Sequence, residues 1–275
     1  MTATAAGERA SGQAGGHADR QKVTAYVITL NEEANIRECL KSLAWADQVL
    51  VVDSYSTDKT CDIARELGAT VVQRKWNGIN EQRQAGLEHC AHDWVFCLDA
   101  DERVSPELKA EIPKALEKPA ADGFEIPRHT WYLGRWINHC GWYPDFKMRL
   151  FRRSRGKFAG TDPHDHFALE GGPGRLKGEI QHFTYKNFAH QLRTINAFSE
   201  AASKELYDKG RRFSLLALLI KPQWKFLEVF IFKAGFLDGL AGFVIAVASA
   251  FNVFTRQVKL WERGKGHDAA GGGPA

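Results

Sequence analysis

Short apolar runs alternate with amphipathic segments through the first hundred residues. The runs are rich in β-branched and aromatic residues, are too short for helices, and span residues 23–30, 48–52, 70–73 and 94–98. Between them apolar residues recur at helical spacing, as at Ile36, Leu40 and Leu43. This alternation of strands and helices predicts an open, mainly parallel α/β sheet.

Polar residues follow the last apolar position of three predicted strands, namely Asn31, Asp53, Asp99 and Asp101. Ligands of such sheets bind beyond the carboxyl ends of the strands, so these residues predict a site at that edge. Asp99, Asp101 and Glu102 repel one another and need cations to offset them. A magnesium or manganese ion bound there would suit the diphosphate of a nucleotide.

The alternative for this acidic stretch is a solvated turn ahead of a helix that begins near Ser105. The usual glycine-rich nucleotide motifs are missing, since no G-x-G-x-x-G follows the first strand and no G-x-x-x-x-G-K-[ST] is present. A bound nucleotide would therefore be held by carboxylates and a metal instead of a glycine cradle.

Three runs carry a resemblance to a known family: TLNEEANIRECLKSL, VVDSYSTDKT and NEQRQAGLEHCAHDWVFCLDADE. They resemble the family-2 glycosyltransferases, and more closely the bacterial branch that contains the lipopolysaccharide inner-core glucosyltransferases. The match is most specific over residues 23–106. It implies a GT-A (Rossmann-like) fold, which is a mixed, mainly parallel sheet with helices on both faces.

The same resemblance implies roles for individual residues at the edge of the sheet. Asp53 would contact the nucleoside, and Asn31 and Glu33 would line the base or ribose pocket. Arg83 would face the nucleotide, and Asp99-x-Asp101 would be the metal and diphosphate motif. Many relatives have Asp-Asp after the second strand, whereas here Ser54 follows Asp53.

The segment 161–166, TDPHDH, places histidines beside aspartates. No further ligands follow at zinc spacing, so a zinc site is not predicted. In the resembling family this region carries the carboxylate that takes the proton of the acceptor hydroxyl. The resemblance therefore implies Asp165 as the general base and His164 as a further metal ligand, with Asp145 as the reserve candidate for the base.

The middle of the chain combines aromatic and basic residues. Aromatic side chains crowd residues 123–158 and include Trp131, Tyr132, Trp136, Trp142 and Tyr143. They predict either a wall against sugar rings or a core or membrane-facing cluster. Six cations within residues 147–157 suit the donor diphosphate or an acidic lipid acceptor, and a solvated basic loop is the alternative. No recognised nucleic-acid module is present, so nucleic acid is not a predicted partner.

The last quarter of the chain is apolar and basic. Residues 239–255 carry no charge over 17 positions, with bulky side chains on one helical face and small ones on the other. Between residues 204 and 265, 11 Lys or Arg stand against 5 Asp or Glu. This pattern predicts a helical, membrane-associating region at 189–262, on the cytoplasmic face of the inner membrane. An ordinary buried helical hairpin is the alternative.

Composition is that of a globular protein, with 44% hydrophobic and 25% charged residues among 275. Five cysteines without a C-x-x-C pair indicate reduced thiols in a cytosolic compartment. No secretory signal is apparent, and residues 1–21 and 263–275 are expected to be disordered tails. The catalytic domain is then expected at residues 22–188.

The sequence therefore predicts an enzyme that moves a sugar from a nucleotide donor, expected to be a UDP-sugar, to a lipid-linked glycan. The resemblance implies a single inverting displacement that uses Mg²⁺ or Mn²⁺. A sugar nucleotidyltransferase is the nearest enzyme alternative, although such enzymes carry a Gly-rich loop where this chain has Asn31-Glu32-Glu33. A non-catalytic, membrane-bound glycan-binding protein is the alternative from another class.

Overall fold

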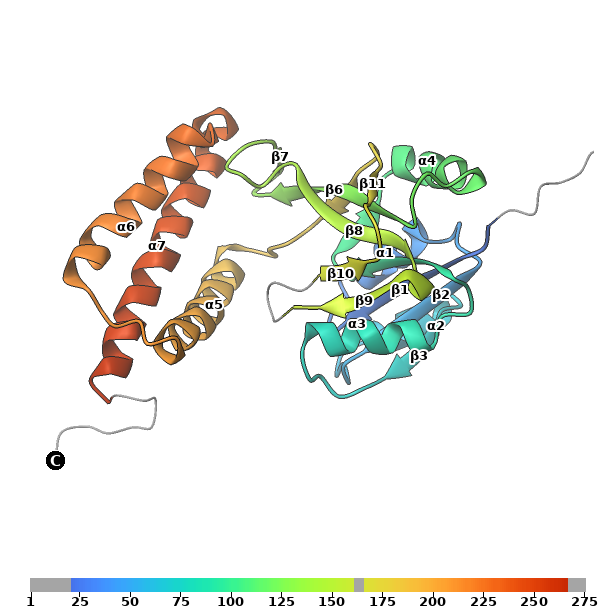
Figure 1. Cartoon of the computed structure of the whole chain (residues 1–275), viewed down its shortest axis with the longest axis horizontal. Coiled ribbons are helices and arrows are strands. Elements are labelled where there is room, and N and C mark those ends of the chain that lie inside the picture. The colour runs from blue at the N-terminus through green and yellow to red at the C-terminus, as the bar shows by residue number, and fades with distance from the viewer. Residues whose placement is uncertain (1–20, 161–165, 267–275) are drawn as a thin grey trace, which may run out of the picture.

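The structure, a computed structural model, describes residues 21–160 and 166–266 and has two parts (Figure 1). The first is an α/β part built on one large sheet. The second is a helical lobe, residues 188–264, in which three long helices pack beside the α/β part. Residues 1–20 and 267–275, which make up most of the tails predicted at 1–21 and 263–275, lie outside the described residues.

The large sheet is mixed and mainly parallel, as predicted. Its strand order is β3 (Thr70–Gln73), β2 (Gln48–Asp53), β1 (Val23–Thr29), β4 (Trp94–Asp99), β8 (Asp145–Arg152), β6 (Gly123–Tyr132), β12 (Ile180–His182) and β5 (Glu102–Val104). The first four strands are parallel, and β8 runs antiparallel to both β4 and β6. The short strands β7 (Arg135–Ile137) and β11 (Gly174–Arg175) pair with β6, while β9 (Gly156–Ala159) pairs with β10 (His166–Leu169).

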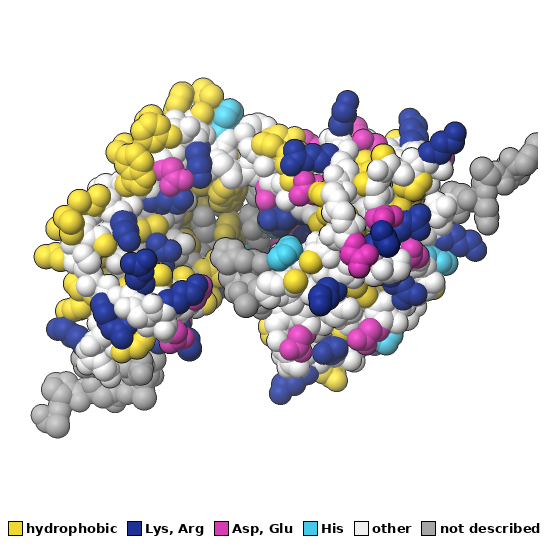
Figure 2. All heavy atoms as spheres, in the orientation of Figure 1, with side chains coloured by type: hydrophobic (Ala, Val, Ile, Leu, Met, Phe, Trp, Pro, Cys, Tyr) yellow, Lys and Arg dark blue, Asp and Glu magenta, His cyan; other side chains and the backbone are white. Residues whose placement is uncertain are grey.

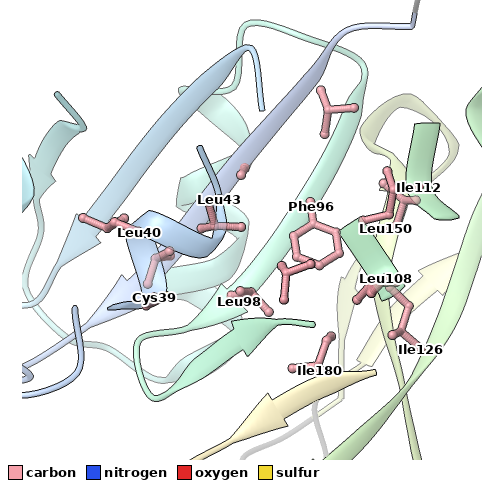
Figure 3. Close-up of a cluster of buried hydrophobic side chains, with 14 of the residues drawn as sticks. Cys39, Leu40, Leu43, Phe96, Leu98, Leu108, Ile112, Ile126, Leu150 and Ile180 are labelled. Carbon is pink, nitrogen blue, oxygen red and sulfur yellow. The ribbon is translucent and has the colours of Figure 1, made fainter. Parts of the chain in front are cut away.

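Helices cover both faces of the sheet, which confirms the predicted architecture. They are α1 (Ile36–Ser42), α2 (Thr60–Glu66), α3 (Ile79–Glu88) and α4 (Pro106–Glu117). On one face Leu40 of α1 and Leu108 of α4 belong to one buried cluster with Phe96 of β4 (Figure 3). On the other face Leu87 of α3 belongs to a second buried cluster with Tyr26. Since both faces are covered, every residue of β1 is buried.

A side-chain cap marks the start of α4, and a carboxylate two residues before α2 accepts from its first amide. Ser105 accepts a hydrogen bond from the Leu108 amide at 3.1 Å, which confirms the helix expected there. Asp58 accepts from the Thr60 amide at 3.0 Å at the start of α2. The neighbouring Ser56 instead donates its backbone amide to Asp53 at 2.9 Å.

The helical lobe is organised around its last helix. α7 (Gly239–Gly264) packs against both α5 (Phe188–Asp208) and α6 (Leu215–Leu227), and short helical turns η2 (Glu228–Phe232) and η3 (Gly235–Asp238) join α6 to α7. The Gly242 Cα lies so close to the Gly235 carbonyl that an added Cβ would stand 1.8 Å from that oxygen. α7 continues two residues past the boundary predicted at 262, and Arg263 there pairs with Glu200 of α5.

Asp238 connects the helical lobe to the α/β part. Its side chain is fully buried and accepts hydrogen bonds from the backbone amides of Asn138 at 3.2 Å and His139 at 2.8 Å. The His139 ring lies 3.2 Å from the same carboxylate. Because these donors come from the loop after β7, one buried carboxylate fixes the start of α7 against the sheet.

Replacing Asp238 by Ala should lower the free energy of unfolding by about 2–4 kcal/mol, because at least two buried amides lose their acceptor. Asp208→Ala, which removes an exposed carboxylate of α5 paired with Lys204, is the control and should change stability by less than about 0.5 kcal/mol. Urea denaturation followed by circular dichroism measures both. Equal midpoints for the two variants would contradict the role given to Asp238.

Candidate active site

The carboxyl ends of three parallel strands meet at one edge of the sheet. Thr29 of β1 lies opposite Asp53 of β2, and Ile28 lies opposite Asp99 of β4. The register therefore places the predicted strand-end residues side by side, as expected from the sequence.

Asn31 and Glu33 link the loop after β1 to the loop after β2, and Asp53 links the loop after β2 to β3. Asp53 is fully buried and accepts from the Ser56 amide at 2.9 Å and from Gln73 at 3.0 Å. Burial raises the pKa of Asp53, but these hydrogen bonds lower it below its usual value overall. Asn31 accepts from the Thr57 amide at 2.8 Å, and Glu33 accepts from the Lys59 amide at 3.2 Å.

The neighbouring cavity is lined by other residues of the same edge. It has a volume of about 380 Å³ and is lined by Ile28, Thr29, Leu30, Glu32, Trp76, Ile79, Asp99, Ala100 and Asp101. Trp76 is 46% exposed and offers its ring to this cavity. Asn31, Glu33 and Asp53 thus shape the edge, whereas Glu32 and Trp76, which the sequence did not single out, reach the open space.

Asp99 is bound by two arginines. Its carboxylate lies 2.8 Å from Arg83 of α3 and 2.7 Å from Arg149 of β8. Arg149 also contacts the buried Glu102 at 2.8 Å, and Glu102 contacts Arg128 of β6 at 3.2 Å. Burial raises the pKa of Asp99, but the charges of Arg149 and Arg83 hold it well below its usual range.

Asp101 has a different partner. β4 ends at Asp99, and Ala100 and Asp101 form a turn, so the two aspartates do not share one neighbour. The Asp101 carboxylate instead lies 3.3 Å from Nε2 of His182, the last residue of β12. Carboxylate oxygen and imidazole nitrogen are both ligands for Mn²⁺, so this pair is a donor set for a divalent metal. Within residues 21–160 and 166–266, no group of three potential ligands gathers at metal distance.

Asp145 is held in ion pairs. It lies 2.6 Å from Arg128 and 3.0 Å from Lys147. Burial raises its pKa, and the charges of Arg128 and Lys147 lower it further than burial raises it. A carboxylate with a lowered pKa accepts a proton less readily, which disfavours Asp145 as a general base. The predicted base Asp165 and the predicted ligand His164 lie outside the described residues.

Two larger cavities lie on either side of Arg128. One, of about 680 Å³, is lined by Asp101, Asp145 and His182 of the α/β part and by aromatic and polar residues toward the helical lobe, namely Trp142, Thr184, Tyr185, His190, Thr194 and Phe198. The other, of about 580 Å³, is cationic and is lined in part by Arg83, Arg128, Lys147 and Arg149. Polar groups that converge in a concave space are typical of a ligand site.

The aromatic and basic clusters of the middle segment divide between core and cavity. Tyr132 is buried in the core, and Trp131 packs edge-on against Trp136, whereas Trp142 lines the larger cavity. Of the six clustered cations, Arg149 and Lys147 line the cationic cavity, and Arg152 pairs with Asp93 outside it. Some of these aromatic and basic residues therefore lie in the core or in ion pairs outside the cavities, and others line a cavity.

His182 and Glu102, like Glu32 and Trp76, are site residues to which sequence reasoning gave no role. His182 ends a strand of three residues, too short to be recognised by its apolar pattern. Glu102 was grouped with Asp99 and Asp101 as a carboxylate in need of a cation but was given no role of its own; it is fully buried, since β5 pairs with β12 at the sheet edge. The only sign of this strand in the sequence is the apolar residue Ile180, two positions before His182, in an otherwise polar stretch.

Comparison with known proteins gives one family. The model of glycosyl transferase family 2 matches residues 24–169. An uncharacterized glycosyltransferase of Rickettsia typhi is 31% identical over 88% of this chain and 87% of its own length. The lipopolysaccharide core biosynthesis glycosyltransferase LpsC of Rhizobium meliloti is 28% identical over 88% of this chain and 92% of its own.

Among solved structures, the mannosyltransferase PcManGT from Pyrobaculum calidifontis, in complex with GDP-Man and Mn²⁺, is similar with a TM-score of 0.48. It is 17% identical, and the match covers 84% of this chain and 74% of that one. Residues 1–349 of TarS from S. aureus match over 91% of this chain and 93% of that one, at 16% identity and a TM-score of 0.44.

The lowered pKa of Asp99 predicts an acid dependence of stability. A carboxyl with a depressed folded pKa stabilises the fold above its unfolded pKa, near 3.9, and loses that contribution as the pH falls through the folded value. Asp99→Asn should therefore show a shallower loss of unfolding free energy below about pH 4 than the wild type. Asp208→Asn, at an exposed pair, should keep the wild-type slope. Parallel slopes for wild type and Asp99→Asn in urea titrations would contradict this prediction.

Proposed function

This chain belongs to glycosyl transferase family 2, and on that premise we propose that it moves a sugar from a nucleotide-diphosphate donor to a lipid-linked glycan. The observation that carries the proposal is the pairing of Asp101 with His182 beside a cationic cavity at the carboxyl edge of the sheet. The similarity to LpsC, named for lipopolysaccharide core biosynthesis, supports an envelope glycan as the acceptor class.

The donor fits the cavities around Arg128 and Asp99. The exposed ring of Trp76 offers a stacking face for the base, next to the edge shaped by Asn31, Glu33 and Asp53. The cationic cavity, with Arg83 and Arg149 in its wall, would receive the diphosphate. A UDP-sugar remains the proposed donor, as the sequence predicted.

Asp101 and His182 would hold a divalent metal, Mg²⁺ or Mn²⁺, with diphosphate oxygens and water as the further ligands. The metal supplies positive charge that offsets the charge developing on the departing diphosphate. Asp99 is fully engaged by Arg83 and Arg149, so we assign it to orienting those arginines toward the donor. The resemblance described under the sequence analysis also implied Asp99 and His164 as ligands of the metal.

The acceptor would enter the cavity that reaches from Asp101 to α5. Its wall offers the Trp142 and Tyr185 rings and the polar side chains of His190 and Thr194, which suit a sugar. Asp165 would take the proton of the attacking hydroxyl in one inverting displacement. Asp145, already paired with two cations, would position the acceptor through Arg128.

The helical lobe supports association with a membrane. Of the 24 large hydrophobic side chains exposed in the described residues, 19 lie at or after Phe188. Those of α6 lie along the outer edge of the lobe (Figure 2). Residues Gly235–Gly264 form one helix long and apolar enough to cross a membrane, with a third of its apolar window buried. With the basic excess, this supports a peripheral or monotopic enzyme on the cytoplasmic face of the inner membrane.

Metal-dependent donor binding tests the proposed metal site. A thermal-shift screen of nucleotide sugars with MnCl₂ should find a donor that raises the melting temperature of the wild type by mass action. Asp101→Asn and His182→Ala should lose the manganese-dependent part of that shift and the transfer activity. His89→Ala, at the exposed end of α3, is the control. Wild-type activity in either site variant would refute the assignment.

Substitution of the two candidate bases should impair different steps of the reaction. Asp165→Asn should lower the transfer rate by a factor of about 10²–10⁴ and leave donor affinity unchanged, because a base acts in proton transfer. Asp145→Asn should mainly weaken acceptor binding or stability, because Arg128 and Lys147 lose a partner. Rates and donor affinities of both variants decide the matter, and the reverse pattern would exchange the two roles.

Charged substitutions on the exposed apolar surface test membrane association. Leu240, which is 76% exposed on α7, and Leu219 on α6 should each, when replaced by Glu, weaken binding to vesicles at least tenfold. Leu67→Glu, at a partly exposed leucine of the α/β part, should bind like the wild type. Flotation without detergent measures binding. If the wild-type protein stays soluble without detergent and fails to float with vesicles of any composition, the membrane proposal is overturned.

A further inference from the structure

A separate cavity lies between α6 and α7, away from the carboxyl edge of the sheet. It has a volume of about 350 Å³ and is lined by Lys221, Trp224, Lys225, Ser249, Asn252, Val253 and Arg256. The α6 residues recur at helical spacing, as do the α7 residues, so each helix contributes one continuous wall. Nothing in the transfer reaction uses this cavity.

The cavity is strongly positive. Three cations line it, and no carboxylate is among its lining residues. Lys225 is partly offset by Glu228 at 3.0 Å, but Glu228 also pairs with Lys233 at 2.7 Å. Within the described parts of the chain, Lys221 and Arg256 form no ion pair with a carboxylate. The space between the helices therefore carries positive charge that the protein itself leaves uncompensated.

Two buried polar atoms in the cavity wall have no hydrogen-bond partner among the described residues. They are Nε of Arg256, a donor, and Oδ1 of Asn252, an acceptor. Leaving such atoms unsatisfied costs about 1–3 kcal/mol each, so most buried polar atoms in proteins are paired. A ligand that combines an anionic oxygen with a nearby hydroxyl or ammonium group would satisfy both once the two side chains turn toward the cavity, since neither atom now has appreciable accessible surface.

Trp224 links the cavity to the exposed apolar surface. Its ring lines the cavity and is also 57% exposed, beside the exposed Ile220 and Leu227 of α6. Tryptophan side chains favour the boundary between lipid and water, and basic pockets between helices at that boundary suit lipid phosphate groups. The cavity therefore lies next to the surface that would meet the bilayer.

We propose that the cavity between α6 and α7 binds a phosphate ester with a neighbouring hydroxyl or ammonium group, the chemistry of a membrane-lipid headgroup. Arg256 would donate to a phosphate oxygen, and Asn252 would accept from the headgroup alcohol or amine. Lys221 would add charge at the mouth. This site rests on the proposed membrane association and is independent of the transfer chemistry.

The test compares two charge-matched double variants of the full-length protein by flotation. Lys221→Gln with Arg256→Gln removes two cations from the cavity, and Lys204→Gln with Lys209→Gln removes two from the exposed surface of α5. Vesicles of phosphatidylcholine alone and vesicles with about a third phosphatidylglycerol serve as probes. The cavity variant should lose about tenfold or more of the preference for phosphatidylglycerol, and the α5 variant should lose little.

The other outcomes are distinguishable. Equal losses in both variants would mean general surface charge and would overturn the site. A cavity variant that keeps the full preference would overturn it as well, while binding of the wild type to both vesicles would leave the membrane proposal intact. Stabilisation of the wild type but not the cavity variant by soluble glycerol 3-phosphate, without any vesicle preference, would support the same phosphate site with a soluble ester as its ligand.

Discussion

The site depends on one buried arginine. Arg149 lies between Asp99 and Glu102 and neutralises two carboxylates that could not otherwise be buried side by side. Arg83 of α3 and Arg128 of β6 complete the network. Ion pairs thus connect α3, β5, β6 and β8 around β4. Removing one partner of such a network leaves a buried charge uncompensated, which costs several kcal/mol. The carboxyl edge therefore owes its geometry to electrostatics as much as to apolar packing.

Much of the α/β part could be predicted because its signals are local. Apolar runs and helical spacing fixed the strands from Val23 to Asp99 and the strand-end positions of Asn31, Asp53 and Asp99. The need for cations at the acidic strand end was also predictable. The identity of those cations was not predictable. Arg149 looked like any other member of a basic run, and its burial depends on the pairing of β8 with β4.

Residues brought in by short, distant strands escaped prediction for the same reason. His182 reaches Asp101 only because β12 pairs with β5 and β6, across about 80 positions of chain from Asp101. In the helical lobe the sequence predicted a membrane-associating helical region, and its composition left a buried hairpin open as the alternative. The exposure of Leu240 and of the α6 surface favours a lipid-facing hairpin, because packing on α5 and α6 still leaves part of α7 exposed.

The first two turns of α5 face two environments. His190 and Thr194 line the cavity that leads to Asp101, whereas Phe188 and Leu192 line an apolar groove against α7. A single rigid helix thus sets how far the reacting centre stands from the hydrophobic surface of the lobe. On a bilayer, the distance between the reacting centre and the membrane surface would then be fixed. An acceptor whose hydroxyl lies too near to its lipid anchor, or too far from it, would not reach the centre, whichever sugar carries that hydroxyl.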